Sequence, residues 1–273
     1  QNIKQLIVNN ENEAKLVNVS NILATQDTEF YGVFVKESVY ASATDSAYFD
    51  FTLTEFSDPI SGQNFNGYRI QPKVSISGKV TLPTTYKNTP VVSIAGFQNS
   101  PVTHVFWDGE CQVVEVARYA FQNLTTLKYF DLAESITYLG DNSFSNCPSL
   151  QLLDFKNSNV TYIAKSAFNG SFYSQSPVVL SLPGCLQHLD EAAFSYNTEI
   201  GNGREPVYST VNIGGSNDPT RLAYLGNEPF IQNNNQRVKV VNVYGNISDD
   251  VKAQIEAQIT PSLGTGGTIN YVG

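Results

Sequence analysis

Apolar residues recur along the middle of the chain with a period of about 23 residues, and a phenylalanine marks each repeat. The gaps between successive phenylalanines are 24, 23, 24, 26 and 36 residues. The six are Phe97, Phe121, Phe144, Phe168, Phe194 and Phe230. Five residues before each stands an aliphatic residue, and the residue directly before is always compact. Such a period is typical of a solenoid, in which each coil buries its apolar face against its neighbours. We therefore expect the six rings to form one internal column.

Each phenylalanine is followed by a triplet in which two apolar residues flank a middle residue, and one more triplet precedes Phe97. The triplets are residues 80–82, 105–107, 130–132, 153–155, 180–182, 211–213 and 241–243. Alternation with a period of two predicts a short strand whose middle residue points outward. We expect an α/β-type solenoid with one short parallel strand per repeat.

The two ends of the chain have different patterns. Residues 247–259, "ISDDVKAQIEAQI", predict a helix, because Ser248 or Asp249 can cap it and aliphatic residues follow at a spacing of four. A short "INYV" strand follows. Near the other end, residues 46–56 alternate as a strand and residues 67–77 fit a partner strand.

Residues 1–45 fit either helix or strand, because short apolar runs do not separate the two. We expect three segments. These are a β-rich N-terminal segment or cap (1–66), the solenoid (67–246) and a C-terminal cap of helix plus strand (247–273).

The repeats resemble the BspA-type leucine-rich repeats of bacterial surface and secreted proteins. The segments that match best are "VTYIAKSAF", "ITYLGDNSFSNCPSLQLLDF" and "VVEVARYAFQNLTTLKYFDL", with Cys147 on the cysteine position of the family. The resemblance covers about residues 68–246. It implies a right-handed superhelix and an exported, non-enzymatic module for recognition or adhesion.

The amino-acid composition of the chain limits the classes of binding partner that we expect. Charged residues make up 15% of the chain, against roughly 25% in an average soluble protein. The net charge is −9 and Lys and Arg form no cluster, so we expect neither nucleic acid nor an anionic membrane surface as partner. No run approaches the ~18 apolar residues of a membrane span. The chain begins at Gln1 without Met, and we expect a removed export signal and an extracellular or cell-surface location.

Candidate chemistry is sparse. The two histidines, His104 and His188, and the three cysteines have no metal-ligand spacing. A triad of His188, Asp190 and Ser195 is disfavoured, because these residues fall along one turn of the repeat. We therefore expect no catalytic residues, no metal and no cofactor.

The outward side of the triplet strands is the candidate binding surface. The residues expected there as ligand contacts are His104, Phe106, Tyr129, Asp131, Asp154, Lys156 and Tyr244. We expect Asp131 and Asp154 on neighbouring strands roughly 5 Å apart. They then form either a solvated pair near Lys156 or a weak cation or sugar site. The aromatic residues either stack on a ligand or are ordinary surface side chains.

Three functions fit these patterns. The first is a recognition or adhesion module that binds protein or glycan through the sheet face and loops. The second is a structural spacer of a surface assembly. The third is a carbohydrate-active enzyme on a parallel β-helix, which the single strand-like triplet per repeat disfavours.

Overall fold

The structure is a computed structural model that describes residues 2–10, 13–23, 45–173, 177–195, 208–230 and 238–273. Contacts divide the chain into two compact units, Gln1–Val39 and Tyr40–Gly273. In the first unit, β1 (Asn2–Asn10) pairs antiparallel with β2 (Glu13–Leu23). Both apolar runs that fitted helix or strand in the sequence are therefore strands.

The phenylalanine column is confirmed in the second unit. All six rings are fully buried, and neighbouring centroids lie 5.1 to 5.8 Å apart with planes inclined by no more than 18°. Phe130 packs edge-on against both Phe121 and Phe144. Because each ring has neighbours above and below, every repeat completes the core of the next one.

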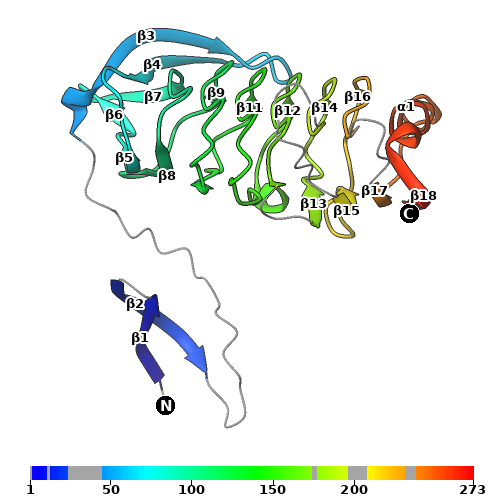
Figure 1. Cartoon of the computed structure of the whole chain (residues 1–273), viewed down its shortest axis with the longest axis horizontal. Coiled ribbons are helices and arrows are strands. Elements are labelled where there is room, and N and C mark those ends of the chain that lie inside the picture. The colour runs from blue at the N-terminus through cyan, green and yellow to red at the C-terminus, as the bar shows by residue number, and fades with distance from the viewer. Residues whose placement is uncertain (1, 11–12, 24–44, 174–176, 196–207, 231–237) are drawn as a thin grey trace. The chain divides into compact units, whose positions relative to one another are not determined.

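The coils form a β-solenoid with parallel strands on two opposite sides (Figure 1). On one side, the triplets supply two sheets of parallel strands. The first sheet contains β5 (Gly78–Leu82), β8 (Val102–Trp107) and β10 (Tyr129–Phe130). The second contains β13 (Val178–Leu182), β15 (Tyr208–Ile213), β17 (Val238–Tyr244) and β18 (Leu263–Val272). We call the solvent side of these seven strands the triplet face.

The opposite side holds a second row of strands that the triplet pattern did not reveal, so most repeats carry two strands rather than one. This row, the ladder, contains β7 (Thr89–Ile94), β9 (Glu115–Val116), β11 (Tyr138–Leu139), β12 (Tyr162–Ile163), β14 (His188–Leu189) and β16 (Tyr224–Leu225). Most of its strands are only two residues long. A period-two pattern needs about four residues to be visible, so these strands escape sequence analysis.

Two triplets depart from the expected strand. In the triplet 130–132, strand β10 ends at the first residue, Phe130. Residues 153–155 form no strand, and a 3₁₀-helix, η2 (Phe155–Asn157), begins at the end of the triplet. This interruption lies between β10 and β13, where the two triplet sheets are separate. Phe155 still points inward and packs edge-on against Phe168, so burial of the aromatic ring is kept while the strand is lost.

Left-handed backbone turns the chain after Phe97, Phe121 and Phe144. Asn99, Asn123 and Asn146 each lie two residues beyond the ring and have φ values of 60°, 61° and 55°. Asparagine tolerates this region better than most residues do. The three asparagine side chains are hydrogen-bonded in series from one repeat to the next. The Asn146 amide donates to Asn123 over 3.0 Å, and the Asn123 amide donates to Asn99 over 3.1 Å.

A hairpin closes the N-terminal end of the ladder. After the short 3₁₀-helix η1 (Ser46–Tyr48), β3 (Phe49–Ser57) pairs antiparallel with β4 (Asn64–Pro72), and β4 pairs parallel with β7. A smaller strand, β6 (Thr85–Tyr86), also pairs with β7. The turn of the first hairpin reaches further along the ladder, where Thr137 donates to the Asp58 carboxylate over 2.8 Å.

The predicted helix lies at the C-terminal end of the ladder. Helix α1 (Asp249–Ile259) begins after Ser248, whose Oγ accepts from the Val251 amide, and it continues into η4 (Thr260–Ser262). The side chains of Gln254 and Gln258 accept hydrogen bonds from the Leu225 and Glu228 amides of the last ladder repeat. The helix therefore satisfies amide groups that no further ladder strand reaches. The segment boundaries at 66/67 and 246/247 stay a prediction, and β4 runs through the first of them.

Candidate functional site

Three of the expected contact residues form an aromatic cluster on the triplet face. Alternation along β8 turns His104 and Phe106 outward, and parallel pairing sets Tyr129 of β10 opposite His104. The ring centroids lie 5.3 Å apart between Phe106 and Tyr129, and 6.1 and 6.4 Å from His104 to these two rings. All three side chains are partly exposed. These three residues therefore lie together on one surface, and their role as ligand contacts stays a prediction.

The surroundings of this cluster carry charge. Burial lowers the pKa of His104, and the nearby Lys79 and Lys128 lower it further. Burial raises the pKa of Tyr129, and Asp131 and Asp154 add to the rise. The imidazole is therefore neutral at pH 7 and the phenol is protonated, so the cluster presents uncharged rings between two lysines and two aspartates.

The expectation that Asp131 and Asp154 lie on adjacent strands is wrong for both residues. Asp131 comes directly after Phe130, the last residue of β10. Asp154 also lies on no strand. It directly precedes η2, and its carboxylate accepts two hydrogen bonds from the Asn157 side-chain amide at 2.9 and 3.1 Å. Asp154 has this position because the triplet sheets are interrupted between β10 and β13. Among the residues that the structure describes, no group of three or more His, Cys, Asp or Glu side chains could hold a metal ion.

The remaining two expected residues, Lys156 and Tyr244, line a cavity of about 420 Å³ further along the triplet face. Its other walls are residues 157, 181–182 and 212, and the loop 214–218. The expected ligand contacts did not include that loop or the polar residues beside it. The available signal was the repeated asparagine in "VNI", "VNV" and "INY", which places Asn212, Asn242 and Asn270 at the centre of three triplets.

These asparagines form a continuous amide ladder. Asn270 donates to Asn242, Asn242 donates to Asn212, and Asn212 donates to the Ser181 hydroxyl, over 3.0, 2.9 and 3.0 Å. Strand β18 carries the last asparagine of this amide ladder, because Asn270 pairs in register with Asn242. The "INYV" segment is therefore a further strand of the triplet sheet, where we expected a strand of the C-terminal cap.

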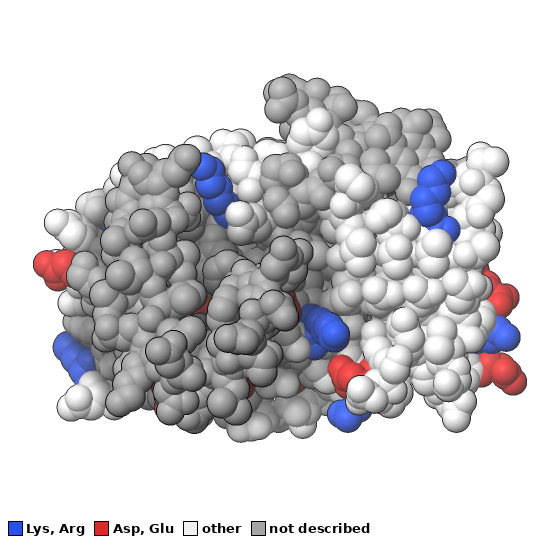
Figure 2. Space-filling view, turned by 90° about the horizontal axis from the view of Figure 1, so that it is seen from below, with Lys and Arg blue, Asp and Glu red and all other residues white. Residues whose placement is uncertain are grey.

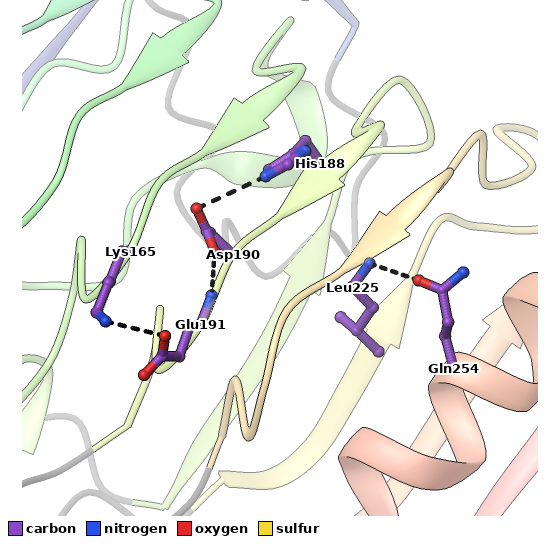
Figure 3. A network of polar contacts seen from close by, with 6 residues as sticks. All are labelled: Lys165, His188, Asp190, Glu191, Leu225 and Gln254. Atoms are coloured by element: carbon purple, nitrogen blue, oxygen red, sulfur yellow. Dashed lines mark hydrogen bonds and ion pairs between the residues drawn. The ribbon is translucent and has the colours of Figure 1, made fainter.

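His188 lies on the other side of the solenoid, in the ladder. Its ring is stacked between Tyr162 and Tyr224, and its Nε2 is 3.7 Å from the Asp190 carboxylate (Figure 3). Ser195 donates its hydroxyl hydrogen to the Glu228 carbonyl. That bond does not involve His188, so the three residues do not have the hydrogen bonding of a catalytic triad.

Charged side chains are dispersed. In the view of Figure 2, the described Lys and Arg side chains lie singly rather than in one patch. On the ladder side, charges of opposite sign alternate between repeats, with Lys165 2.9 Å from Glu191 (Figure 3) and Arg118 3.8 Å from Asp141. No helix in the described part of the chain is both long enough and apolar enough to cross a membrane.

The geometry defines a parallel β-solenoid of the leucine-rich-repeat class. The family model for the BspA type leucine rich repeat region matches residues 92–202 in six copies. The repeats over residues 92–202 therefore match the BspA-type leucine-rich-repeat family, as the sequence motifs indicated. Members of this family typically act in protein binding or adhesion, are generally not enzymes, and are typically secreted or surface proteins of bacteria.

Two solved structures of bacterial leucine-rich-repeat proteins are similar. One is the leucine-rich-repeat protein TpLRR of T. pallidum, with 17% identity over 78% of this chain and 94% of that chain, and a TM-score of 0.42. The other comes from Bacteroides ovatus ATCC 8483, with 15% identity over 81% of this chain and 70% of that chain, and a TM-score of 0.40. No curated protein matches the chain.

Proposed function

We propose that this protein is a non-enzymatic recognition module that acts outside the cell or at its surface and binds a protein partner through the aromatic cluster. The observation that supports this proposal is that the rings of His104, Phe106 and Tyr129 lie together on two paired strands. Aromatic side chains dominate the binding energy of many interfaces because they bury a large area with few rotatable bonds.

The rigidity of the support favours binding. The inward neighbours of the cluster, Val105 and Phe130, are buried in the continuous core, so the strands that carry the rings are fixed before a partner arrives. A preformed surface loses little conformational entropy on association. The exposed Lys79 and Lys128 favour acidic side chains of the partner beside His104. Asp131 and Asp154 favour basic side chains beside Tyr129.

The test is binding to an array of extracellular proteins, with a glycan array alongside. We expect a protein ligand whose affinity falls by about 30-fold in the Phe106→Ser/Tyr129→Ser variant, because central aromatic contacts contribute about 2 kcal/mol or more. The matched control is Tyr224→Ser, which removes a ring that is 44% exposed on the ladder side.

Two outcomes contradict the proposal. A ligand that binds the double variant as well as the unaltered protein places recognition elsewhere. Absence of any protein ligand at micromolar concentration favours the alternative role of a structural spacer in a surface assembly.

A further inference from the structure

We propose that the cavity between Lys156 and Tyr244 binds a neutral sugar unit of a glycan. The cavity does not include the aromatic cluster, so this inference stands or fails independently of the protein-binding site. Its volume of about 420 Å³ lies within the 300 to 1,000 Å³ typical of small-molecule sites.

The loop that forms one wall is held in place by hydrogen bonds. Gly215 and Asp218 bond to each other through their backbones, and the Gly214 amide donates to Leu182. The Asp218 carboxylate accepts from the Gly184 amide over 2.7 Å. A side chain at Gly184 would collide with Asp218, because an added Cβ would lie 2.4 Å from its backbone oxygen. The wall is therefore formed before any ligand binds.

The amide ladder leaves hydrogen-bonding capacity that matches hydroxyl groups. Asn212 uses one N–H on Ser181 and one acceptor position on Asn242, so a second N–H and a second lone pair remain. Ser181 accepts from Asn212 and keeps its own hydrogen to donate. A fixed donor beside a fixed acceptor suits a sugar hydroxyl, which does both.

The charges of the lining favour a neutral ligand. Lys156 is its one cation and Asp218 its one anion, so an anionic ligand would meet a carboxylate and a cationic ligand would meet an ammonium group. The partly exposed side chain of Tyr244 provides an aromatic wall. Such a surface packs against the C–H groups of a sugar ring while the polar groups fix its hydroxyls.

The test is NMR titration of the whole chain with glucose, galactose, mannose, N-acetylglucosamine and short neutral oligomers built from each. Glucuronate, sialic acid and an acidic peptide serve as charged comparisons. We expect at least one neutral sugar to shift the amide signals of Ser181, Asn212 and loop 214–218. This mapping uses the unaltered protein and so does not depend on whether a variant folds.

Variants then assign the contacts. Ser181→Ala and Tyr244→Ala should each weaken the affinity for that sugar by about tenfold or more. Asn270→Ala is the matched control, since it removes an amide of the same ladder outside the cavity, and Phe106→Ser/Tyr129→Ser tests the separate site. Both controls should bind the sugar unchanged. The assignment is overturned if no neutral sugar shifts these signals up to about 10 mM. Shifts caused only by the charged probes, or shifts that map to the aromatic cluster, overturn it as well.

Discussion

His188 and Tyr162 lie face to face in adjacent ladder strands, with ring centroids 3.9 Å apart and an angle of 9° between the planes. Parallel pairing of β12 with β14 sets the two residues opposite each other, and Tyr224 covers the far side of the imidazole. The pKa of His188 is lowered because burial disfavours the imidazolium, although Asp190 acts in the opposite direction.

This geometry predicts a loss of stability in mild acid. Below the ordinary histidine value of 6.5, the unfolded chain takes up a proton that the folded chain resists, so the free energy of unfolding falls as the pH drops through this value toward the lowered pKa. His104 is lowered in the same way and contributes too. His188→Phe should keep the ring stack but weaken this pH dependence. Urea unfolding at several pH values between about 7.5 and 5 measures it, and an unchanged pH profile in the variant would contradict the prediction.

Phe144 lies at the centre of the ring column, 5.2 Å from both Phe121 and Phe168. Phe144→Ala should lower the free energy of unfolding by about 3–5 kcal/mol, because a fully buried ring is replaced by a cavity. The matched control is Phe106→Ala on the triplet face, which should cost far less. Equal losses in the two variants, measured by urea unfolding, would show that the column is not the core of the solenoid.

Asn146 combines a left-handed backbone with a side-chain hydrogen bond to Asn123. Asn146→Gly and Asn146→Ala both remove the hydrogen bond, but only alanine adds the steric cost of positive φ. The free energy of unfolding of the Asn146→Ala variant should therefore be lower than that of the Asn146→Gly variant by about 1 kcal/mol. The comparison of their urea midpoints tests this, and equal stability would rule out backbone conformation as the reason for asparagine here.

Glu115 is a buried carboxylate that holds the N-terminal hairpin to the ladder. It accepts from Ser93 over 2.5 Å and from Arg69 over 3.0 Å, and Arg69 also donates to Ser93. Arg69→Met should destabilise the protein by about 1–3 kcal/mol, because the carboxylate keeps its burial and loses its charged donor. Adding Glu115→Gln should recover part of that loss, since a neutral amide tolerates burial better. A strictly additive double-mutant cycle in thermal or urea unfolding would refute the coupling.

Cys147 should be inert to thiol reagents in the native state. It is fully buried, its Sγ donates to the Phe121 carbonyl, and burial raises its pKa to about 12. Cys111 and Cys185 are partly exposed. Burial raises the pKa of Cys185, so mass spectrometry after brief alkylation at about pH 8 should find label on Cys111, less on Cys185, and none on Cys147 until the protein is unfolded. Label on Cys147 in the folded protein would mean that the interior of the solenoid opens readily.

The candidate sites could be foreseen only in part. Outward positions follow from alternation along each triplet, so His104, Phe106 and Tyr129 could be grouped before any coordinates. The sequence could not show that these three residues and the pair Lys156 and Tyr244 belong to two separate sites. That separation follows from the loss of the strand at Asp154 and Phe155. The cavity wall could not be foreseen either, since the hydrogen bond between Asp218 and Gly184 joins residues that are 34 positions apart in the sequence.

The sequence by itself determined the repeat, the column of six phenylalanines and the inward or outward direction of most triplet residues; Thr81, the middle residue of the first triplet, is buried. These features depend on local periodicity, which a chain carries in its order of apolar and polar residues. The two-residue strands of the ladder, the stack of His188 between two tyrosines and the sugar-sized cavity were decided by tertiary structure. Each of them exists only where separate coils come into register, and that contact depends on the packing of the coils more than on any single segment.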